Sequence, residues 1–208
     1  MFDLETLTDR DVLVVIDAQN DFCPGGALAV PGGDEIMTMV DALARRFPHV
    51  VLTQDWHPAD QISFASTHGA EPFSTRQVAY GEQVMWPDHC VQGTPGADFH
   101  PLIKQGAELR AELIVRKGYN RAVDSYSAFF ENDRRTATGL AGYLRDRGLT
   151  RCVFVGLALD FCVRYSAEDA VRLGFEAVVI TEATRAIDMA GSGAAALESL
   201  RTLGVVLA

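Results

Sequence analysis

The fold of this chain is decided by one stretch of sequence, Arg151-Cys-Val-Phe-Val-Gly-Leu-Ala-Leu-Asp-Phe-Cys-Val163. Its apolar run from Cys152 to Val155 predicts a buried strand, and residues 156–160 predict a tight turn. Residues 163–173 predict a helix whose first turn contains Cys162. Unpaired N–H groups and the positive end of the helix dipole favour a thiolate at such a position. We therefore expect Cys162 to be a nucleophile, although a lone cysteine is more often a small buried apolar residue.

The same strand pattern recurs along the chain, and it predicts a parallel sheet. Each run is continuously apolar rather than alternating, as in strands that are covered on both faces. The six predicted strands are residues 12–17, 50–55, 113–117, 152–156, 177–181 and 205–207. Helical periodicity lies between most of them, and glycines stop three of the helices, at Gly148, Gly174 and Gly204. We expect an α/β fold, a three-layer sandwich with a six-stranded parallel sheet, in a single domain over residues 1–208.

One connection is unusually long. Residues 56–112 contain no clear strand and are rich in proline, glycine, histidine and aromatic residues. Long irregular connections in compact domains tend to be functional. We expect this segment to contribute to a site.

Composition limits the classes of partner. The chain of 208 residues carries 18 basic and 28 acidic side chains, a formal charge of −10, without a basic patch. Such a charge repels phosphate backbones and anionic lipid, so we expect a small-molecule substrate, no nucleic acid and no membrane partner. The N-terminal residues show no secretory signal, and the longest apolar run is far shorter than the roughly 20 residues that span a bilayer. We expect a cytoplasmic location with four free thiols.

Reactive side chains stand where the predicted strands end. Asp17, Asp55 and Lys117 close the first three strands, and Cys162 follows the fourth by one turn. The carboxyl ends of parallel strands form the ligand crevice of an open sheet. Any one of these residues alone is more often a solvated loop residue, but their shared placement favours a site.

These residue types suit nucleophilic catalysis. Asp17 can accept the proton of the thiol as a general base, and Lys117 can hold both groups and depress the pKa of the thiol. The turn before the helix can aim backbone N–H groups at a developing oxyanion, with Ala158 and Cys162 as the donors.

A metal site is also indicated. Asp55 and His57 are two residues apart at a strand end and so point the same way, and His89 lies in a proline-flanked loop that can fold over them. One carboxylate and two imidazoles suit Zn²⁺, Mn²⁺ or Fe²⁺, of which we favour Zn²⁺. Surface histidines are the competing interpretation.

Taken together, these motifs resemble the nicotinamidases (pyrazinamidases), in the cysteine-hydrolase branch of the isochorismatase-like superfamily. The resemblance covers nearly the whole chain. It rests on Val15-Ile-Asp-Ala-Gln-Asn-Asp-Phe-Cys-Pro-Gly-Gly26, Thr53-Gln-Asp-Trp-His-Pro58, Trp86-Pro-Asp-His-Cys-Val91, Lys117-Gly118, Asp124-Ser-Tyr-Ser-Ala-Phe129 and Gly156-Leu-Ala-Leu-Asp-Phe-Cys-Val163.

The resemblance implies a Rossmann-like strand order and hydrolysis of nicotinamide to nicotinate and ammonia through a cysteine thioester. It implies a triad of Asp17, Lys117 and Cys162, and a metal that is held by Asp55, His57 and His89 and meets the pyridine nitrogen. It further implies a cis peptide between Leu157 and Ala158 that shapes the oxyanion hole. The implied substrate-binding residues are Phe22, Trp86, Tyr126 and Leu157. NAD salvage and a side activity on pyrazinamide follow from the same resemblance.

Some points stay open. Many nicotinamidases carry a histidine four residues after the position of His57, where this chain has Gln61, so Ser63, Gln61 or water completes the metal shell. Related amidohydrolases act on carbamoyl or ureido compounds, and a noncatalytic metal-binding or redox-sensing protein is the alternative from another class. A homo-oligomer is compatible with the resemblance, but nothing in the residues decides the oligomeric state.

Overall fold

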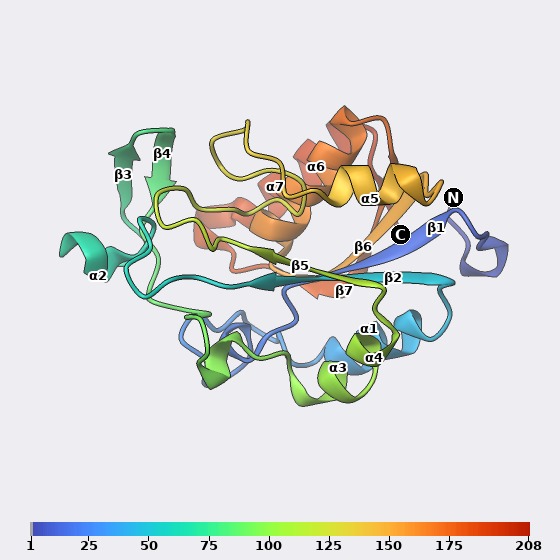
Figure 1. Ribbon diagram of the computed structural model, residues 1–208, viewed down its shortest axis with the longest axis horizontal. Coiled ribbons are helices and arrows are strands. Elements are labelled where there is room, and N and C mark those ends of the chain that lie inside the picture. The colour runs from blue at the N-terminus through green and yellow to red at the C-terminus, as the bar shows by residue number, and fades with distance from the viewer. Residues whose placement is uncertain (1) are drawn as a thin grey trace.

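The computed structural model of the protein describes residues 2–208, and its core is a six-stranded parallel sheet (Figure 1). The strand order is β5-β2-β1-β6-β7-β8. The strands are β1 Asp11–Ile16, β2 His49–Asp55, β5 Leu113–Lys117, β6 Arg151–Leu157, β7 Glu176–Arg185 and β8 Val206–Leu207. All six predicted strands are confirmed, and the order reverses between β1 and β6, where the chain crosses from one half of the sheet to the other.

Helices cover both faces of the sheet, which confirms the three-layer sandwich (Figure 1). One layer contains α1 Met37–Ala44, α3 Pro101–Gln105 and α4 Ala107–Arg110, and the other contains α5 Leu140–Asp146, α6 Arg164–Arg172 and α7 Ser192–Thr202. Alternate residues of β1 divide between the two cores: Leu13 and Val15 pack on one side, and Val12 and Val14 on the other. Burial on both faces is the reason that the strands read as continuous apolar runs.

The glycines after the helices behave as predicted. Gly148, Gly174 and Gly204 follow α5, α6 and α7 with φ angles of 70°, 88° and 83°. A residue with a side chain is strained in this left-handed region, so glycine ends each helix at little cost.

The long connection between β2 and β5 is more regular than the sequence indicated. It contains an antiparallel hairpin of β3 Thr75–Val78 and β4 Gly81–Val84, with α2 Ala65–His68 before it. The expectation of no strand in this segment was wrong. β3 is mostly exposed and both strands are mainly polar, so neither a continuous apolar run nor a strict alternation marks the hairpin in the sequence.

The turn after β6 also differs in detail. The strand extends to Leu157, and the chain enters α6 through one π-helical turn, Leu159–Val163, which contains Cys162. The peptide bond between Leu157 and Ala158 is cis. Short 3₁₀ segments complete the fold at Leu4–Thr6, Asn20–Phe22, Pro95–Ala97 and Met189–Gly191.

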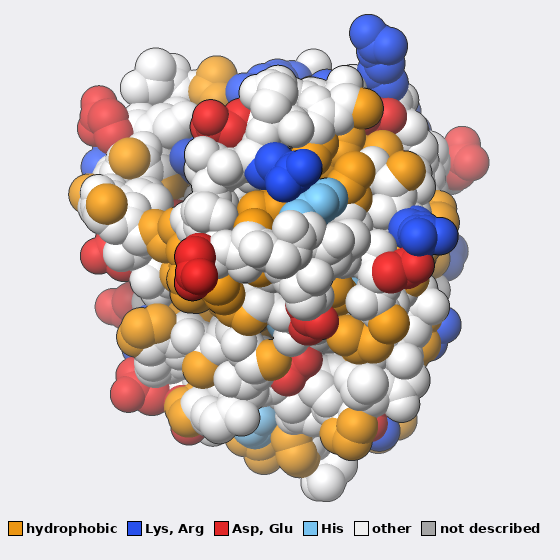
Figure 2. All heavy atoms as spheres, turned by 90° about the vertical axis from the view of Figure 1, so that its left-hand side faces the viewer, with side chains coloured by type: hydrophobic (Ala, Val, Ile, Leu, Met, Phe, Trp, Pro, Cys, Tyr) orange, Lys and Arg blue, Asp and Glu red, His pale blue; other side chains and the backbone are white. Residues whose placement is uncertain are grey.

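The edge of the sheet at which β2 and β5 end faces the viewer in Figure 2. Acidic and basic side chains are interspersed with apolar ones on this face. Within residues 2–208, no helix combines the length and the apolar character that crossing a membrane requires.

Candidate active site

Lys117 lies at the centre of the side chains that end the strands. Its Nζ is 2.8 Å from Oδ2 of Asp17 and 3.4 Å from Sγ of Cys162, and it donates a hydrogen bond to Oδ1 of Asp55. It also donates to the carbonyl of Ser125, at 3.1 Å. Lys117 is 1 % exposed and Asp17 is fully buried. The four residues that the sequence singled out at strand ends thus meet at one point.

Two carboxylates keep this buried amine charged. Burial alone would lower the pKa of Lys117, but Asp17 and Asp55 raise it well above its ordinary value. A buried cation between two carboxylates is stable only if it keeps all of these contacts, because an unpaired buried charge is costly. Lys117 is therefore a fixed positive charge beside the thiol.

Asp17 has one oxygen fixed and one directed at the other reactive groups. Oδ1 accepts a hydrogen bond from the Thr53 hydroxyl at 2.6 Å. Oδ2 forms the ion pair with Lys117, but among the described residues it accepts no hydrogen bond of good geometry. Burial and the charge of Asp55 raise the pKa of Asp17 to about 6, against the opposing effect of Lys117. A carboxyl group with a pKa near neutrality can both accept and return a proton.

The predicted nucleophile, Cys162, lies in a buried setting that opposes the thiolate which the sequence pattern favours. Burial raises the pKa of its thiol well above the ordinary value, and the lowering by Lys117 is offset by Asp17 and Asp55. The side chain is 7 % exposed, and its sulfur lies in a π-helical turn rather than in the first turn of α6. The thiol therefore needs a base at the moment of attack, and Sγ lies within 4.8 Å of a carboxylate oxygen of Asp17.

Two backbone amides near the sulfur, those of Ala158 and Cys162, are the candidate donors to an oxyanion. The carbonyl of Ala158 accepts hydrogen bonds from the N–H groups of Phe161 and Val163, both at 3.1 Å. It accepts none from the N–H of Cys162, which lies between them in the sequence. Within residues 2–208, the N–H of Ala158 donates no hydrogen bond to a backbone or side-chain acceptor. Both amides belong to residues that line the same cavity. The arrangement suits an oxyanion hole.

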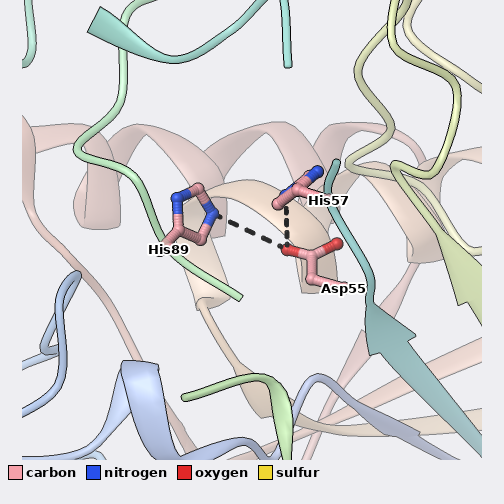
Figure 3. Close-up of side chains that lie close together, drawn as sticks. All are labelled: Asp55, His57 and His89. Atoms are coloured by element: carbon pink, nitrogen blue, oxygen red, sulfur yellow. Dashed lines mark ion pairs between the residues drawn. The ribbon is translucent and has the colours of Figure 1, made fainter. Parts of the chain in front are cut away.

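Asp55, His57 and His89 form a compact ligand set beside the thiol (Figure 3). Nε2 of His57 and Nε2 of His89 lie 3.6 Å and 3.9 Å from Oδ2 of Asp55. The other ring nitrogen of each histidine contacts a backbone carbonyl: Nδ1 of His57 that of Gly118, at 2.9 Å, and Nδ1 of His89 that of Pro87, at 2.8 Å. Such contacts fix the tautomer and leave both Nε2 lone pairs facing the carboxylate, which is the usual arrangement of histidine ligands.

The charges of Asp55 and His89 agree with metal binding, whereas Asp55 outweighs burial and raises the pKa of His57, so His57 must release a proton when a metal binds. Burial would raise the pKa of Asp55, but Lys117 and His57 lower it below its ordinary value. Burial and the neighbouring His57 lower the pKa of His89 to about 4, so its ring is neutral near pH 7. An ionised carboxylate and a neutral imidazole are the forms that bind a divalent metal. The residues present therefore fit a metal such as Zn²⁺.

Gln61 and Ser63 differ in their freedom to complete the shell. The amide nitrogen of Gln61 donates to the Gly118 carbonyl at 2.8 Å, and its oxygen accepts the N–H of Ile62 at 2.8 Å. The hydroxyl of Ser63 is fully buried and has no hydrogen-bond partner among residues 2–208. The Gln61 side chain is thus already hydrogen-bonded to the backbone, whereas the Ser63 oxygen is available to complete the metal shell.

The cavity over these groups is small. Its volume is about 20 Å³, room for little more than one water molecule. The lining residues are Phe22, Leu28, Asp55, His57, Trp86, His89, Asp124, Tyr126, Ala158, Phe161, Cys162 and Ile187. Trp86, Tyr126 and Phe161 meet edge to face, with ring centroids 4.9 to 6.2 Å apart. An aromatic ring can enter only if these side chains move apart.

A family profile described as the Isochorismatase domain matches residues 11–208. The chain belongs to the isochorismatase family. Within this family it is 51 % identical over 194 residues to a nicotinamidase of Acinetobacter baylyi, an alignment that covers 93 % of this chain and 89 % of that protein.

Solved structures of the isochorismatase family agree with the fold. PnC1 from L. infantum, solved in complex with nicotinate, is 39 % identical with a TM-score of 0.84, over 98 % of this chain and 94 % of that one. A pyrazinamidase of Pyrococcus horikoshii, solved in complex with zinc, is 33 % identical with a TM-score of 0.78, over 96 % and 98 % of the two chains.

Of the predicted pocket residues, Phe22, Trp86 and Tyr126 line the cavity. Leu157 is fully buried in the same apolar cluster as Phe22 and Trp86, and its role in substrate binding stays a prediction. Sequence reasoning gave no cavity role to the lining residues Leu28, Asp124 and Ile187. Asp124 lies inside a matched motif, which was the available signal. Leu28 and Ile187 lie outside the motifs that carry the resemblance.

Proposed function

We propose that this protein is an amidohydrolase that converts nicotinamide to nicotinate and ammonia through a thioester on Cys162. The observation that carries the proposal is the convergence of three buried groups: Nζ of Lys117 contacts both Oδ2 of Asp17, at 2.8 Å, and Sγ of Cys162, at 3.4 Å. The name of the 51 % identical relative, a nicotinamidase, supports the choice of substrate.

The first half of the reaction forms the thioester. Asp17 accepts the thiol proton as the sulfur of Cys162 attacks the carboxamide carbon. The N–H groups of Ala158 and Cys162 donate to the oxygen on which negative charge develops, and removal of one such donor typically raises the barrier by about 3 kcal/mol. Asp17 then returns its proton to the leaving nitrogen, and ammonia departs.

The second half releases the acid. Asp17, again ionised, accepts a proton from a water molecule that attacks the thioester carbon, and the same two amides hold the oxyanion. Collapse of this intermediate expels the sulfur of Cys162, which takes the proton back, and nicotinate is released. Lys117 keeps its charge throughout and holds Asp17 and the sulfur in contact distance.

Asp55, His57 and His89 would hold a divalent metal, for which we favour Zn²⁺. The zinc complex of the P. horikoshii pyrazinamidase supports this choice. When bound, the metal supplies a Lewis-acid contact for the pyridine nitrogen. The pyridine ring of the substrate would pack between Phe22 and the three edge-to-face aromatic side chains of Trp86, Tyr126 and Phe161. Pyrazinamide has a ring of the same size and also a ring nitrogen, so we propose it as a second substrate.

A related cysteine amidohydrolase that acts on a carbamoyl or ureido compound is the main alternative. The aromatic wall and the metal ligand set support an aromatic amide instead, because a linear urea offers neither a π face nor a ring nitrogen. We further propose a place in NAD salvage, a cytoplasmic location and one domain over residues 1–208.

Ammonia release from nicotinamide by the purified, metal-loaded protein tests the function directly. A panel of pyrazinamide and ureido compounds separates the alternatives.

Rapid quenching followed by mass spectrometry should find a nicotinoyl adduct on Cys162, and an adduct found solely on another cysteine would refute the assignment. Exhaustive chelation should abolish turnover, and full activity of a metal-free preparation would remove Asp55, His57 and His89 from the mechanism.

A further inference from the structure

The β3–β4 hairpin reaches the cavity wall through one buried side chain. Gln83 of β4 is 2 % exposed, although its strand lies in a small sheet of its own at one side of the molecule (Figure 1). Its amide nitrogen lies 2.6 Å from the hydroxyl of Tyr126, 2.9 Å from the Val84 carbonyl and 3.3 Å from Asp124 Oδ2, and its two protons serve the two shorter contacts. A second donor, Nε1 of Trp86, reaches the same hydroxyl at 3.0 Å.

The direction of these hydrogen bonds is fixed from both ends. The backbone N–H of Tyr126 can only donate, so the side-chain oxygen of Asn132, 3.0 Å away, must accept, which turns the Asn132 NH₂ group toward Gln83. That group donates to Oε1 of Gln83 at 3.0 Å. At the other end of Gln83, the Val84 carbonyl and the Asp124 carboxylate can only accept. The amide of Gln83 therefore has a single orientation.

This orientation decides what the Tyr126 hydroxyl can do. A phenolic oxygen has two lone pairs, and here Gln83 and Trp86 occupy both with their N–H groups. Among residues 2–208, the hydroxyl donates no hydrogen bond. Burial raises the pKa of Tyr126 well above its ordinary value, so the proton stays on the oxygen. Tyr126 lines the cavity, and its one unused capacity is that of a donor.

We propose that Gln83 is a positioning residue that acts through Tyr126: it occupies a lone pair of the hydroxyl and so presents the hydroxyl proton as a donor to an acceptor atom of the bound substrate. Through the same hydroxyl it locks the indole of Trp86 against the ring of Tyr126, whose centroids are 6.2 Å apart. The inference deepens the proposed function and rests on it, since the substrate is taken to be nicotinamide.

The substitution Gln83→Glu tests this proposal because it reverses the direction of the hydrogen bond between residue 83 and the Tyr126 hydroxyl. A carboxylate keeps the size of the side chain and still accepts from Asn132 and from the Tyr80 hydroxyl, 3.1 Å away in the native protein. When ionised it cannot donate, so the Tyr126 hydroxyl turns its proton toward residue 83 and away from the substrate. Because the Asp124 carboxylate lies 3.3 Å from the native amide nitrogen and favours the protonated acid, KM is measured at several pH values and Gln83→Met, which cannot donate at any pH, is measured beside it. We expect KM for nicotinamide and Kd for nicotinate to rise about tenfold, the order expected when a buried hydrogen bond is lost, with kcat changed less than about threefold.

The hairpin offers a matched control. Gln77 of β3 is exposed, so Gln77→Glu makes the same chemical change on the same hairpin without touching the cavity. We expect wild-type KM from this variant. Thermal unfolding and metal content are measured for both proteins, and Gln83→Met, which neither donates nor accepts, also serves as the test if the carboxylate prevents folding.

A double-mutant cycle with Tyr126→Phe separates positioning from simple support of the hairpin. If Gln83 acts through the hydroxyl, Gln83→Glu should change KM and Kd less than about twofold in the Tyr126→Phe background. An unchanged KM for Gln83→Glu, or an equally large effect without the hydroxyl, would overturn the inference. A wild-type protein that releases no ammonia from nicotinamide would instead refute the proposed function, so the two failures are distinguishable.

Discussion

Gly118 contacts the ring of His57 in two ways. Its carbonyl accepts a hydrogen bond from Nδ1 at 2.9 Å, and its α-carbon faces the ring so closely that a Cβ there would overlap Cε1 and Nδ1. The absence of a side chain at residue 118 thus sets the position of a metal-ligand candidate.

Gly118→Ala should therefore weaken metal binding. The added methyl group must push the imidazole away from Asp55, and displacement of such supporting contacts typically costs about 10- to 100-fold in metal affinity. Competition with a chromogenic chelator measures the change. The matched control is Gly69→Ala, because Gly69 has a similar φ of 59° against 68° at Gly118 but no atom within 4 Å of a new Cβ. Equal metal affinities of the two variants would contradict this role of Gly118.

Cys162→Ser should reduce turnover by roughly a thousandfold or more, since removal of a nucleophile commonly has effects of this size or larger. A serine hydroxyl is a far weaker acid than a thiol, so Asp17 cannot ionise it readily. Stopped assays of ammonia release measure the loss, and binding of nicotinate should persist because the pocket is unchanged. Turnover at the wild-type rate would end the nucleophile assignment.

The other three cysteines should stay unmodified during turnover. Burial raises the pKa of Cys23 to about 11 and that of Cys152 to about 12, and Cys90 is also shifted well upward by burial. All four cysteines are free and buried, but only Cys162 has an amine 3.4 Å from its sulfur. Peptide mapping after rapid quenching checks the distribution of the adduct.

Asp160 should position one wall of the cavity. Its carboxylate is 1 % exposed and accepts the N–H groups of Ile187 and Asp188, at 3.0 and 2.8 Å, and the hydroxyl of Ser192 at 2.5 Å. Asp160→Ala removes all three bonds, so we expect a loss of unfolding free energy of about 2 kcal/mol and a KM raised severalfold, because Ile187 lines the cavity. Ser192→Ala removes one bond and should have a smaller effect on both. Unfolding in urea and steady-state kinetics provide the two measurements, and a native KM in Asp160→Ala would contradict the role.

Asp11 should make stability depend on pH at the opposite end of the sheet. It accepts from the Thr8 N–H at 2.6 Å and from Nη2 of Arg151 at 2.8 Å. Burial opposes ionisation, but the bonds to Arg151 and Thr8 lower its pKa below the ordinary 3.8. Because the folded pKa is the lower one, the contribution is complete above the pKa of the unfolded chain and is lost as pH falls through the folded value.

Asp11→Asn should therefore be less stable than the wild type by about 2 kcal/mol at pH 7, the size of a hydrogen bond to a charged group. The difference should begin to shrink as the pH falls below about 3.8, where the carboxyl of the unfolded chain binds a proton, and should be lost once the pH is below the lower pKa of the folded protein. Urea unfolding at a series of pH values measures it. A difference that stays constant into acid would show that the charge of Asp11 is not the cause.

The strands and the reactive residues could be predicted because local sequence encodes them. A strand that is covered on both faces is continuously apolar, so the six strands could be recognised as apolar runs. Polar residues at the ends of such runs, such as Asp17 and Asp55, indicate the edge of the sheet where ligands bind. The β3–β4 hairpin could not be predicted in this way. The one buried residue of its two strands is Gln83, a polar residue that hydrogen-bonds to Asp124, Tyr126 and Asn132 far along the chain.

Periodicity and chain order, which depend on neighbours in the chain, were enough to predict the sheet, its helices and the chemical types that meet at its edge. The burial of the Cys162 thiol among charged groups, and the presence of Asp124 and Ile187 in the cavity wall, could be seen only in the folded protein. A pKa depends on burial and on charges brought from other strands, and a cavity wall depends on which side chains the folded chain places opposite one another. Neither quantity exists until segments that are distant in sequence have packed together.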